Sequence, residues 1–202
     1  MNFFQFPYKE NSLEGVFGLG VRTFKFPIRY GVSLSSAPSI DHKVENCFDG
    51  NPLTICHTDA YLNGTEYLQI QFYDFKFKIE GFAIQNRPDG YWNPLNYVIQ
   101  GSNDGINFVN ISFFNEISTE VCNSGGIRTR RISTNFLFSF FRLRTTGAAC
   151  TWNDGMISNK YLFNMAEFDL FGYFGNDCFC TQIQKQTVFY ISIAWFIMLI
   201  YS

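Results

Sequence analysis

The chain has 202 residues, of which 47% are hydrophobic, 19% aromatic and only 16% charged, with 25 Phe and 11 Tyr. This composition excludes an intrinsically disordered chain, because such chains are rich in charge and poor in aromatic residues. Fifteen Lys and Arg against 17 Asp and Glu give a formal net charge of −2. Binding to a phosphate backbone depends on a basic surplus, so we expect no nucleic acid partner.

Residues 1–32 are interpreted as an N-terminal extension. Aromatic residues alternate near the start, and the stretch SLEGVFGLG at 12–20 is interrupted by glycines. Glycine in a helix interior costs about 1 kcal/mol relative to alanine, so we expect no stable helix here. The small, polar segment SLSSAPS at 33–39 leads into the main domain.

From residue 67 onward, apolar and polar residues alternate as they do in half-buried strands. In YLQIQF at 67–72 one face is apolar and the other carries two glutamines, and similar segments follow at 79–85, 96–101, 138–145 and 163–171. Turn sequences rich in Asn, Asp and Gly separate them, which predicts an all-β sandwich or jelly roll. The core predicted from these faces contains Leu68, Ile70, Phe72, Phe82, Ile84, Val98, Phe141, Leu143, Phe168 and Leu170.

The C-terminal part has a different character. Residues 173–187 are interpreted as a linker and 188–202 as a hydrophobic tail, in which VFYISIAWFIMLIY at 188–201 is apolar except for one serine. As a helix this segment spans about 21 Å, short of the roughly 30 Å hydrocarbon core. We expect a short membrane anchor or, alternatively, a tail without a functional role.

The start of the chain bears on its location. It has no basic segment followed by an apolar stretch, so we expect no signal peptide. A glycosylphosphatidylinositol signal at the C-terminus would need one. We therefore expect a cytoplasmic protein or a tail-anchored one that faces the cytoplasm, or a cell-surface protein if the N-terminus is incomplete.

No catalytic motif is present. The chain has two histidines, His42 and His57, and lacks the GxSxG, HExxH, P-loop and dinucleotide-binding signatures. Cys56 and His57 are adjacent, but neighbours on a strand point to opposite faces, so we expect no nucleophilic pair. The six cysteines lack zinc-site spacing and allow 15 connectivities if all are bridged, which leaves their pairing open. We expect a protein that is not an enzyme.

One loop, FDGNPLT at 48–54, combines oxygen-bearing side chains with a Gly-Pro bend. Asp49, Asn51 and Thr54 can bring oxygens to one hard cation such as Ca²⁺, which takes six to eight oxygen ligands. The alternative is an ordinary Asp-Gly turn with Thr54 at the start of a strand.

Six sequence blocks, taken in order, resemble the discoidin domain, the coagulation factor V/VIII type C domain of the galactose-binding-like superfamily. They are FDGN (48–51) with TICHT (54–58), YLQIQF (67–72), IEGFAIQ (79–85), YVIQGSNDG (97–105), FFRLRTTG (140–147) and EFDLFG (167–172). The resemblance covers residues 33–172, which we interpret as the domain. It implies a jelly-roll β-sandwich of about eight antiparallel strands, with loops at one end that bind sugars, lipid headgroups or proteins.

The resemblance also implies a structural calcium ion. Many members hold Ca²⁺ in the loop that matches Asp49, Asn51 and Thr54, closed by a glutamate near the last strand, which is Glu167 here. Asp49 and Glu167 would then supply two negative charges to balance the ion.

Galactose-binding modules of the superfamily carry an Arg-x-Asp-Gly-x-x-Asn stretch, which this chain matches from Arg87 to Asn93. The resemblance implies that both residues form hydrogen bonds with sugar hydroxyls. His57 is a third polar candidate, although the Trp that is usual just before it is Cys56 here, which places the local packing in doubt. The candidates for an aromatic platform under the sugar are Tyr91, Trp92 and Trp152.

Two functions fit these features. The first is a non-catalytic module that recognises carbohydrate or glycoprotein of the galactose type. The second is an intracellular protein-interaction module, which the missing targeting signal favours. Phospholipid binding through Tyr91 and Trp92 comes last, because no cluster of lysines accompanies them, and a membrane partner enters through residues 188–201.

Overall fold

The computed structural model describes residues 4–36, 41–58, 66–89, 93–116, 122, 125–147, 149–150, 157–158 and 164–175. The strands are β1 (Gln5–Phe6), β2 (Tyr30–Leu34), β3 (Cys56–His57), β4 (Tyr67–Phe72), β5 (Lys76–Gln85), β6 (Asn96–Ser102), β7 (Val109–Asn115), β8 (Ile127–Arg131), β9 (Phe140–Thr145), β10 (Ala149–Cys150), β11 (Ile157–Ser158), β12 (Asn164–Met165) and β13 (Glu167–Gly175). A π-helix, η1 (Val16–Thr23), and a 3₁₀ turn, η2 (Val44–Cys47), complete the described elements. None of these helices is long and apolar enough to cross a membrane.

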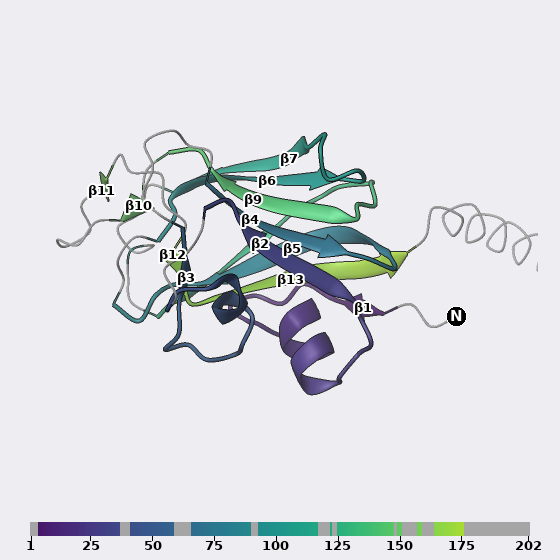
Figure 1. The fold of residues 1–202 in the computed structure, drawn as a ribbon, viewed down its shortest axis with the longest axis horizontal. Coiled ribbons are helices and arrows are strands. Elements are labelled where there is room, and N and C mark those ends of the chain that lie inside the picture. Colours follow the sequence, from purple (N-terminus) through teal and green to yellow (C-terminus); the bar gives the residue numbers. More distant parts are fainter. Residues whose placement is uncertain are drawn as a thin grey trace, which may run out of the picture.

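Two antiparallel sheets pack face to face as a β-sandwich (Figure 1). One sheet has the strand order β1-β13-β5-β8 and the other the order β2-β4-β9-β6-β7. The short pairs β3–β12 and β10–β11 lie together at one end of the sandwich. The all-β sandwich predicted from the sequence is therefore confirmed.

The core between the sheets is largely aromatic. Every core residue predicted from the alternation of strand faces is buried. Phe72, at the end of β4, packs in one aromatic cluster, with its ring centroid 5.5 Å from that of Phe77 and 5.0 Å from that of Phe174. Full burial of one such side chain stabilises the fold by about 1.5–3 kcal/mol, so these rings supply much of the driving force for folding.

The register of β5 on β13 defines the two ends of the sandwich. Glu167 lies opposite Gln85 at one end, and Gly175 lies opposite Lys76 at the other. We call the first end the loop pole, because the segments 41–58 and 86–89 lie there, and the second the chain-end pole. At the chain-end pole the N–H of Phe174 donates to the carbonyl of Phe4 at 3.2 Å, so the two ends of the domain lie side by side (Figure 1).

The segment predicted as an N-terminal extension is built into the sandwich. β1 forms an edge strand on β13, with Gln5 opposite Tyr173. Residues 16–23 form η1, where we expected no stable helix, so that expectation is wrong. The domain therefore contains residues N-terminal to the predicted boundary at 33.

Gly15 and Gly18, which made a helix unexpected here, lie where the backbone approaches the buried carboxylate of Asp169 closely. The backbone N–H groups of Gly15, Phe17 and Gly18 donate to the Asp169 carboxylate at 2.8, 2.9 and 3.1 Å. A Cβ on Gly15 would lie 2.2 Å from the carbonyl oxygen of Leu170, so no larger residue fits without a shift of the backbone. The contacts with Asp169 satisfy N–H groups at the start of η1 that have no partner within the helix.

A buried ion pair joins the two sheets near the loop pole. Arg128 of β8 donates from Nη1 to Glu116, which follows β7, at 2.9 Å. Its Nε donates to Asn86 Oδ1 at 3.0 Å, and the Tyr97 hydroxyl donates to the same Glu116. Asn86 directly precedes Arg87, so this network fixes the start of the loop that carries the predicted sugar site.

Asp169→Asn should strongly destabilise the fold. The amide keeps the shape of the carboxylate but places an NH₂ group against backbone N–H donors, which then lose their acceptor. Removing charge-assisted bonds from a fully buried group is expected to lower the free energy of unfolding by about 3 kcal/mol or more, measurable by urea denaturation. Asp74→Asn, in an exposed pair with Arg29, is the matched control and should have little effect. Equal stability of the two variants would contradict the role of Asp169.

Candidate functional site

Arg87 follows β5 at the loop pole. Its N–H donates to Asn93 Oδ1 at 3.1 Å, and its carbonyl accepts from the N–H of Gly125 at 2.8 Å. Its Nη2 donates to Asp89 Oδ2 at 2.6 Å, with side chains that are 17% and 39% exposed. The Nε–H is buried and has no hydrogen-bond partner among the described residues. The loop pole therefore carries a partly exposed Arg87–Asp89 ion pair, in which the buried Nε–H of Arg87 has no partner among the described residues.

Asn93 has a different position from the one expected for a sugar contact. It is completely buried, and its side-chain oxygen accepts the N–H of Arg87. Its carbonyl accepts the N–H of Cys150 at 3.0 Å. Asn93 therefore closes the base of the 87–93 loop. The aromatic candidates Tyr91, Trp92 and Trp152 lie outside the described residues.

His57 lies on β3, opposite Asn164 of β12. Its Nδ1 is 2.8 Å from the carbonyl oxygen of Thr58. Because a carbonyl only accepts, Nδ1 must carry the proton of this hydrogen bond, and in the neutral ring Nε2 is then the acceptor.

His42, which no sequence motif marks, lies against His57. The two ring centroids are 4.2 Å apart, and the N–H of His57 donates to the carbonyl of His42 at 3.4 Å. Burial lowers the pKa of His42, and the positive charges of His57 and Arg87 lower it further, against the opposite effect of Asp41. The two histidines of the chain therefore pack together, and Arg87 lies close enough to act on the charge of His42. The sequence does contain one indication of this contact, because His42 and His57 lie on either side of the loop that contains residues 49–54.

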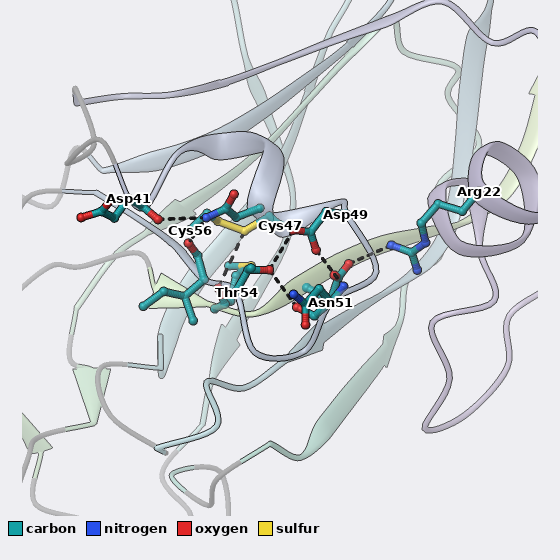
Figure 2. The surroundings of a disulfide bond; sticks show 11 residues. Arg22, Asp41, Cys47, Asp49, Asn51, Thr54 and Cys56 are labelled. Carbon is teal, nitrogen blue, oxygen red and sulfur yellow. Dashed lines mark hydrogen bonds and ion pairs between the residues drawn. A yellow bond between two sulfur atoms is a disulfide. The ribbon is translucent and has the colours of Figure 1, made fainter.

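A disulfide between Cys47 and Cys56 closes the loop that contains residues 49–54 (Figure 2). Both cysteines are fully buried and belong to the hydrophobic core, so the disulfide anchors the base of this loop. A second disulfide joins Cys122 and Cys150. These two pairs fix part of the connectivity that the sequence leaves open.

Within this loop, three of the four predicted calcium ligands form hydrogen bonds with one another. Asp49 accepts from the N–H of Asn51 at 2.7 Å and from Thr54 Oγ1 at 2.8 Å. Thr54 Oγ1 is also 2.8 Å from the carbonyl oxygen of Asn51 (Figure 2). These are the contacts of an Asx turn, in keeping with the Asp-Gly turn that the sequence leaves open, although the next strand begins at Cys56 and not at Thr54.

Glu167, the fourth predicted ligand, meets an arginine from η1. Arg22 Nη1 donates to Glu167 Oε2 at 2.9 Å and to the carbonyl of Phe48 at 3.2 Å, and Figure 2 shows Arg22 reaching toward the loop. Gly50 makes room for it, because a Cβ there would lie 3.0 Å from Arg22 Nε. Burial raises the pKa of Glu167 to about 7, an effect that Arg22 opposes and the neighbouring Asp49 carboxyl group increases.

In this arrangement the residues do not fit a calcium ion. The Arg22 guanidinium already binds Oε2 of Glu167, and both oxygens of Asp49 accept hydrogen bonds. Of the two carboxylates, only Oε1 of Glu167 is buried without a partner, whereas Ca²⁺ takes six to eight oxygens. The described part of the chain also contains no group of three or more His, Cys, Asp or Glu that could hold a metal. Nothing in the sequence around Arg22 marks it for this position.

Arg22→Met should lower the melting temperature, because it leaves the buried Glu167 without its cation. We expect a loss of about 2 kcal/mol, which corresponds to roughly 4–8 °C for a domain of this size. Calcium and EGTA should leave the wild-type melting curve unchanged. Arg29→Met, which breaks an exposed pair, is the control. A wild-type protein that calcium stabilises and EGTA destabilises would show instead that the predicted ion binds.

The raised pKa of Glu167 predicts a pH-dependent contribution to stability. The folded protein holds this proton more tightly than the unfolded chain, in which the group has its ordinary value of 4.5, and its pKa in the folded protein is about 7. The contribution is therefore complete below about pH 4.5 and is lost as the pH rises through 7. Urea denaturation between pH 4.5 and 8 gives the free energy of unfolding at each pH. Its dependence on pH should differ between wild type and Glu167→Gln. Parallel curves would contradict it.

Solved structures with the same fold come from carbohydrate-binding modules. CpGH89CBM32-5 from Clostridium perfringens, in complex with GalNAc-β-1,3-galactose, is 18% identical with a TM-score of 0.54, over 71% of this chain and 95% of that one. CBM32-3 from a family 31 glycoside hydrolase of the same organism is 20% identical with a TM-score of 0.55, over 69% and 88%. The family 32 module of C. perfringens NanJ, in complex with galactose, is 17% identical with a TM-score of 0.50, over 71% and 93%.

At these identities the likeness shows the fold alone. No curated protein matches the chain. The family model of the F5/8 type C domain matches residues 32–159, which is more than half of the chain and begins next to the predicted boundary at 33. The chain therefore belongs to the F5/8 type C, or discoidin, domain family.

Proposed function

We propose that this domain is a non-catalytic carbohydrate-binding module, and that it recognises a galactose-type sugar at the loop pole. The observation that carries the proposal is the convergence of Arg87, Asp89, His42 and His57 at one end of the sandwich. The modules with the same fold, bound to galactose and to GalNAc-β-1,3-galactose, support the choice of ligand.

The Arg87–Asp89 pair suits the recognition of neighbouring hydroxyl groups. The ion pair orients the guanidinium, which is the exposed end of the Arg87 side chain. Asp89 is more exposed than Arg87 and accepts hydrogen bonds, and His57 Nε2 adds a second acceptor. A sugar hydroxyl both donates and accepts, so a site that offers both functions can bind two hydroxyls of one ring.

In this proposal Asn93 acts by shaping the loop, through its bond to the N–H of Arg87. Tyr91, Trp92 and Trp152 remain the proposed stacking residues, because an aromatic face covers the apolar side of a pyranose ring. A solvated site for one monosaccharide makes few net hydrogen bonds, so we expect a Kd of about 0.1–1 mM and avidity through clustering.

The predicted calcium ion is not part of the proposal. Arg22 already supplies a positive charge to Glu167. The melting experiment with calcium and EGTA tests whether Arg22 or Ca²⁺ is the partner of this carboxylate.

A protein-interaction module is the second candidate. The observation that favours it is the Arg87–Asp89 pair itself, because a guanidinium held by a neighbouring carboxylate also suits a loop that docks on another protein. A domain that binds no glycan on an array would favour this candidate.

Arg87→Ala should weaken binding of methyl β-galactoside at least tenfold, about 1.4 kcal/mol, in an NMR titration. The melting temperature should change little, because Arg87 is partly exposed and lies on a loop. Arg29→Ala is the matched control, since Arg29 also pairs with an aspartate, but at the chain-end pole. If Arg87→Ala binds the sugar as well as wild type does, the sugar site is not at Arg87.

A further inference from the structure

The strand β7 contains the acceptor pattern for N-linked glycosylation. Asn110, Ile111 and Ser112 form an Asn-x-Ser/Thr triplet in which the middle residue is not proline. Such a triplet also arises by chance in a chain that contains many Asn, Ser and Thr residues, so its surroundings in the fold decide what it means. A second triplet, at 63–65, lies outside the described residues.

The amide nitrogen of Asn110 is accessible. The residue is exposed and lies opposite Gln100 of β6, whose Nε2 donates to Asn110 Oδ1 at 2.7 Å. This hydrogen bond uses the oxygen of the carboxamide. It leaves Nδ2, the atom to which an N-linked glycan is attached, without a hydrogen-bond partner among the described residues.

A β-bulge separates Asn110 from the packed part of the strand. Ser112 lies opposite Ile99 and Asn110 lies opposite Gln100, so Ile111 is the extra residue between them. Ile111 packs against the hydrophobic core, whereas Asn110 is exposed. A glycan on Asn110 therefore displaces no core contact.

The edge formed by β7 lacks charged protection (Figure 1). Val109–Asn115 contains no charged residue and no proline, and Val109 and Phe113 are 55% and 65% exposed. By contrast β8, an edge of the other sheet, carries three arginines. An uncharged apolar edge strand is a template for pairing with other chains, and apart from its bulge β7 has none of the usual defences. A bulky, hydrophilic glycan at this strand would supply one.

The disulfides indicate the compartment in which the domain folds. One joins Cys47 and Cys56, the other joins Cys122 and Cys150. Disulfides are typical of the secretory pathway and the cell exterior and are rare in the cytosol, where thiols are kept reduced. N-linked glycans are added in the same pathway. The disulfides are an observation independent of the triplet, because all four cysteines lie outside β7.

We propose that Asn110 carries an N-linked glycan and that the domain reaches the cell surface or the exterior through the secretory pathway. The donor is an oligosaccharide on a lipid-linked diphosphate. The bond between Nδ2 and the anomeric carbon of the first sugar forms, the bond from that carbon to the diphosphate oxygen breaks, and Nδ2 loses one proton. No group is oxidised or reduced. Among the locations expected from the sequence, this is the cell-surface one.

The glycan leaves the candidate sugar site open. Asn115 lies opposite Asn96, which follows the loop closed by Asn93, so this end of β7 is at the loop pole. Asn110 precedes Asn115 by five residues, which along a strand is about 16 Å. The proposal uses no residue of the sugar site, and its failure would leave the sugar titration of Arg87→Ala unaffected.

The test is the mass of the full chain isolated from the cells that make it, before and after digestion with peptide N-glycosidase. The enzyme removes the glycan and converts the attached Asn to Asp, so the mass should fall and the peptide that contains residue 110 should carry this conversion. Ser112→Ala should abolish the modification. Ser112→Thr keeps the triplet and should retain it. Thr65→Ala removes the other triplet and is the matched control, in which the glycan at residue 110 should remain.

Three outcomes would overturn the proposed modification. They are a residue 110 that carries no glycan in wild type, a modification that persists in Ser112→Ala, and cysteines 47 and 56 that alkylate without prior reduction. The last outcome would place the protein in a reducing compartment.

The protective role of the glycan has its own readout. Ser112→Ala should give an about tenfold larger aggregated fraction in sedimentation than Ser112→Thr, because its β7 edge is uncovered. Their melting temperatures should agree within about 2 °C, which shows that both variants are folded. Equal aggregation of the two variants would overturn the protective role.

Discussion

The neutralisation of two buried carboxylates on β13 is the constraint on which the rest of this domain depends. Glu167 and Asp169 are two residues apart and therefore point to the same face of the strand, and both are at most 1% exposed. An uncompensated buried charge is costly, so each must find a positive partner. The segment from Gly15 to Arg22 supplies both partners: backbone N–H groups for Asp169 and a guanidinium for Glu167.

This requirement explains why the N-terminal residues belong to the domain although the family model begins at residue 32. The same docking places Arg22 against the carbonyl of Phe48, at the start of the loop closed by the Cys47–Cys56 disulfide. His57 follows Cys56 directly, and β3 pairs with β12, which ends two residues before Glu167. One connected framework therefore positions the carboxylates of β13, the loop closed by the Cys47–Cys56 disulfide, and His57.

The strands could be predicted where burial of one face imposes a pattern on the sequence. The segment at 67–72 was predicted with the bounds of β4, because each of its apolar residues faces the core. β7 was not predicted, because it is an edge strand with exposed Val109 and Phe113 and a weak pattern. The helix η1 could not be predicted from its own residues, since its stability comes from contact with Asp169, more than 145 residues away along the chain.

The candidate site was predictable only in part. The sequence marks the Arg87 motif and His57 as candidates, and the structure places both at the loop pole, because spacing within a loop and next to a strand is visible in a sequence. The burial of Asn93 and the ion pair of Arg22 with Glu167 depend on how distant segments pack. No local pattern encodes such contacts.

The length of the strands separates the two poles physically. β5 runs from Lys76 at the chain-end pole to Gln85 at the loop pole, which at about 3.3 Å per residue is a distance of about 30 Å. Effects of changes at sites this far apart usually add, so a substitution at the chain-end pole should leave the candidate site at the loop pole unaffected. Attachment to a surface also brings many copies close together, and this raises the avidity of a site whose single-copy affinity is weak. The sandwich between the poles thus holds the proposed recognition site away from the two ends of the domain.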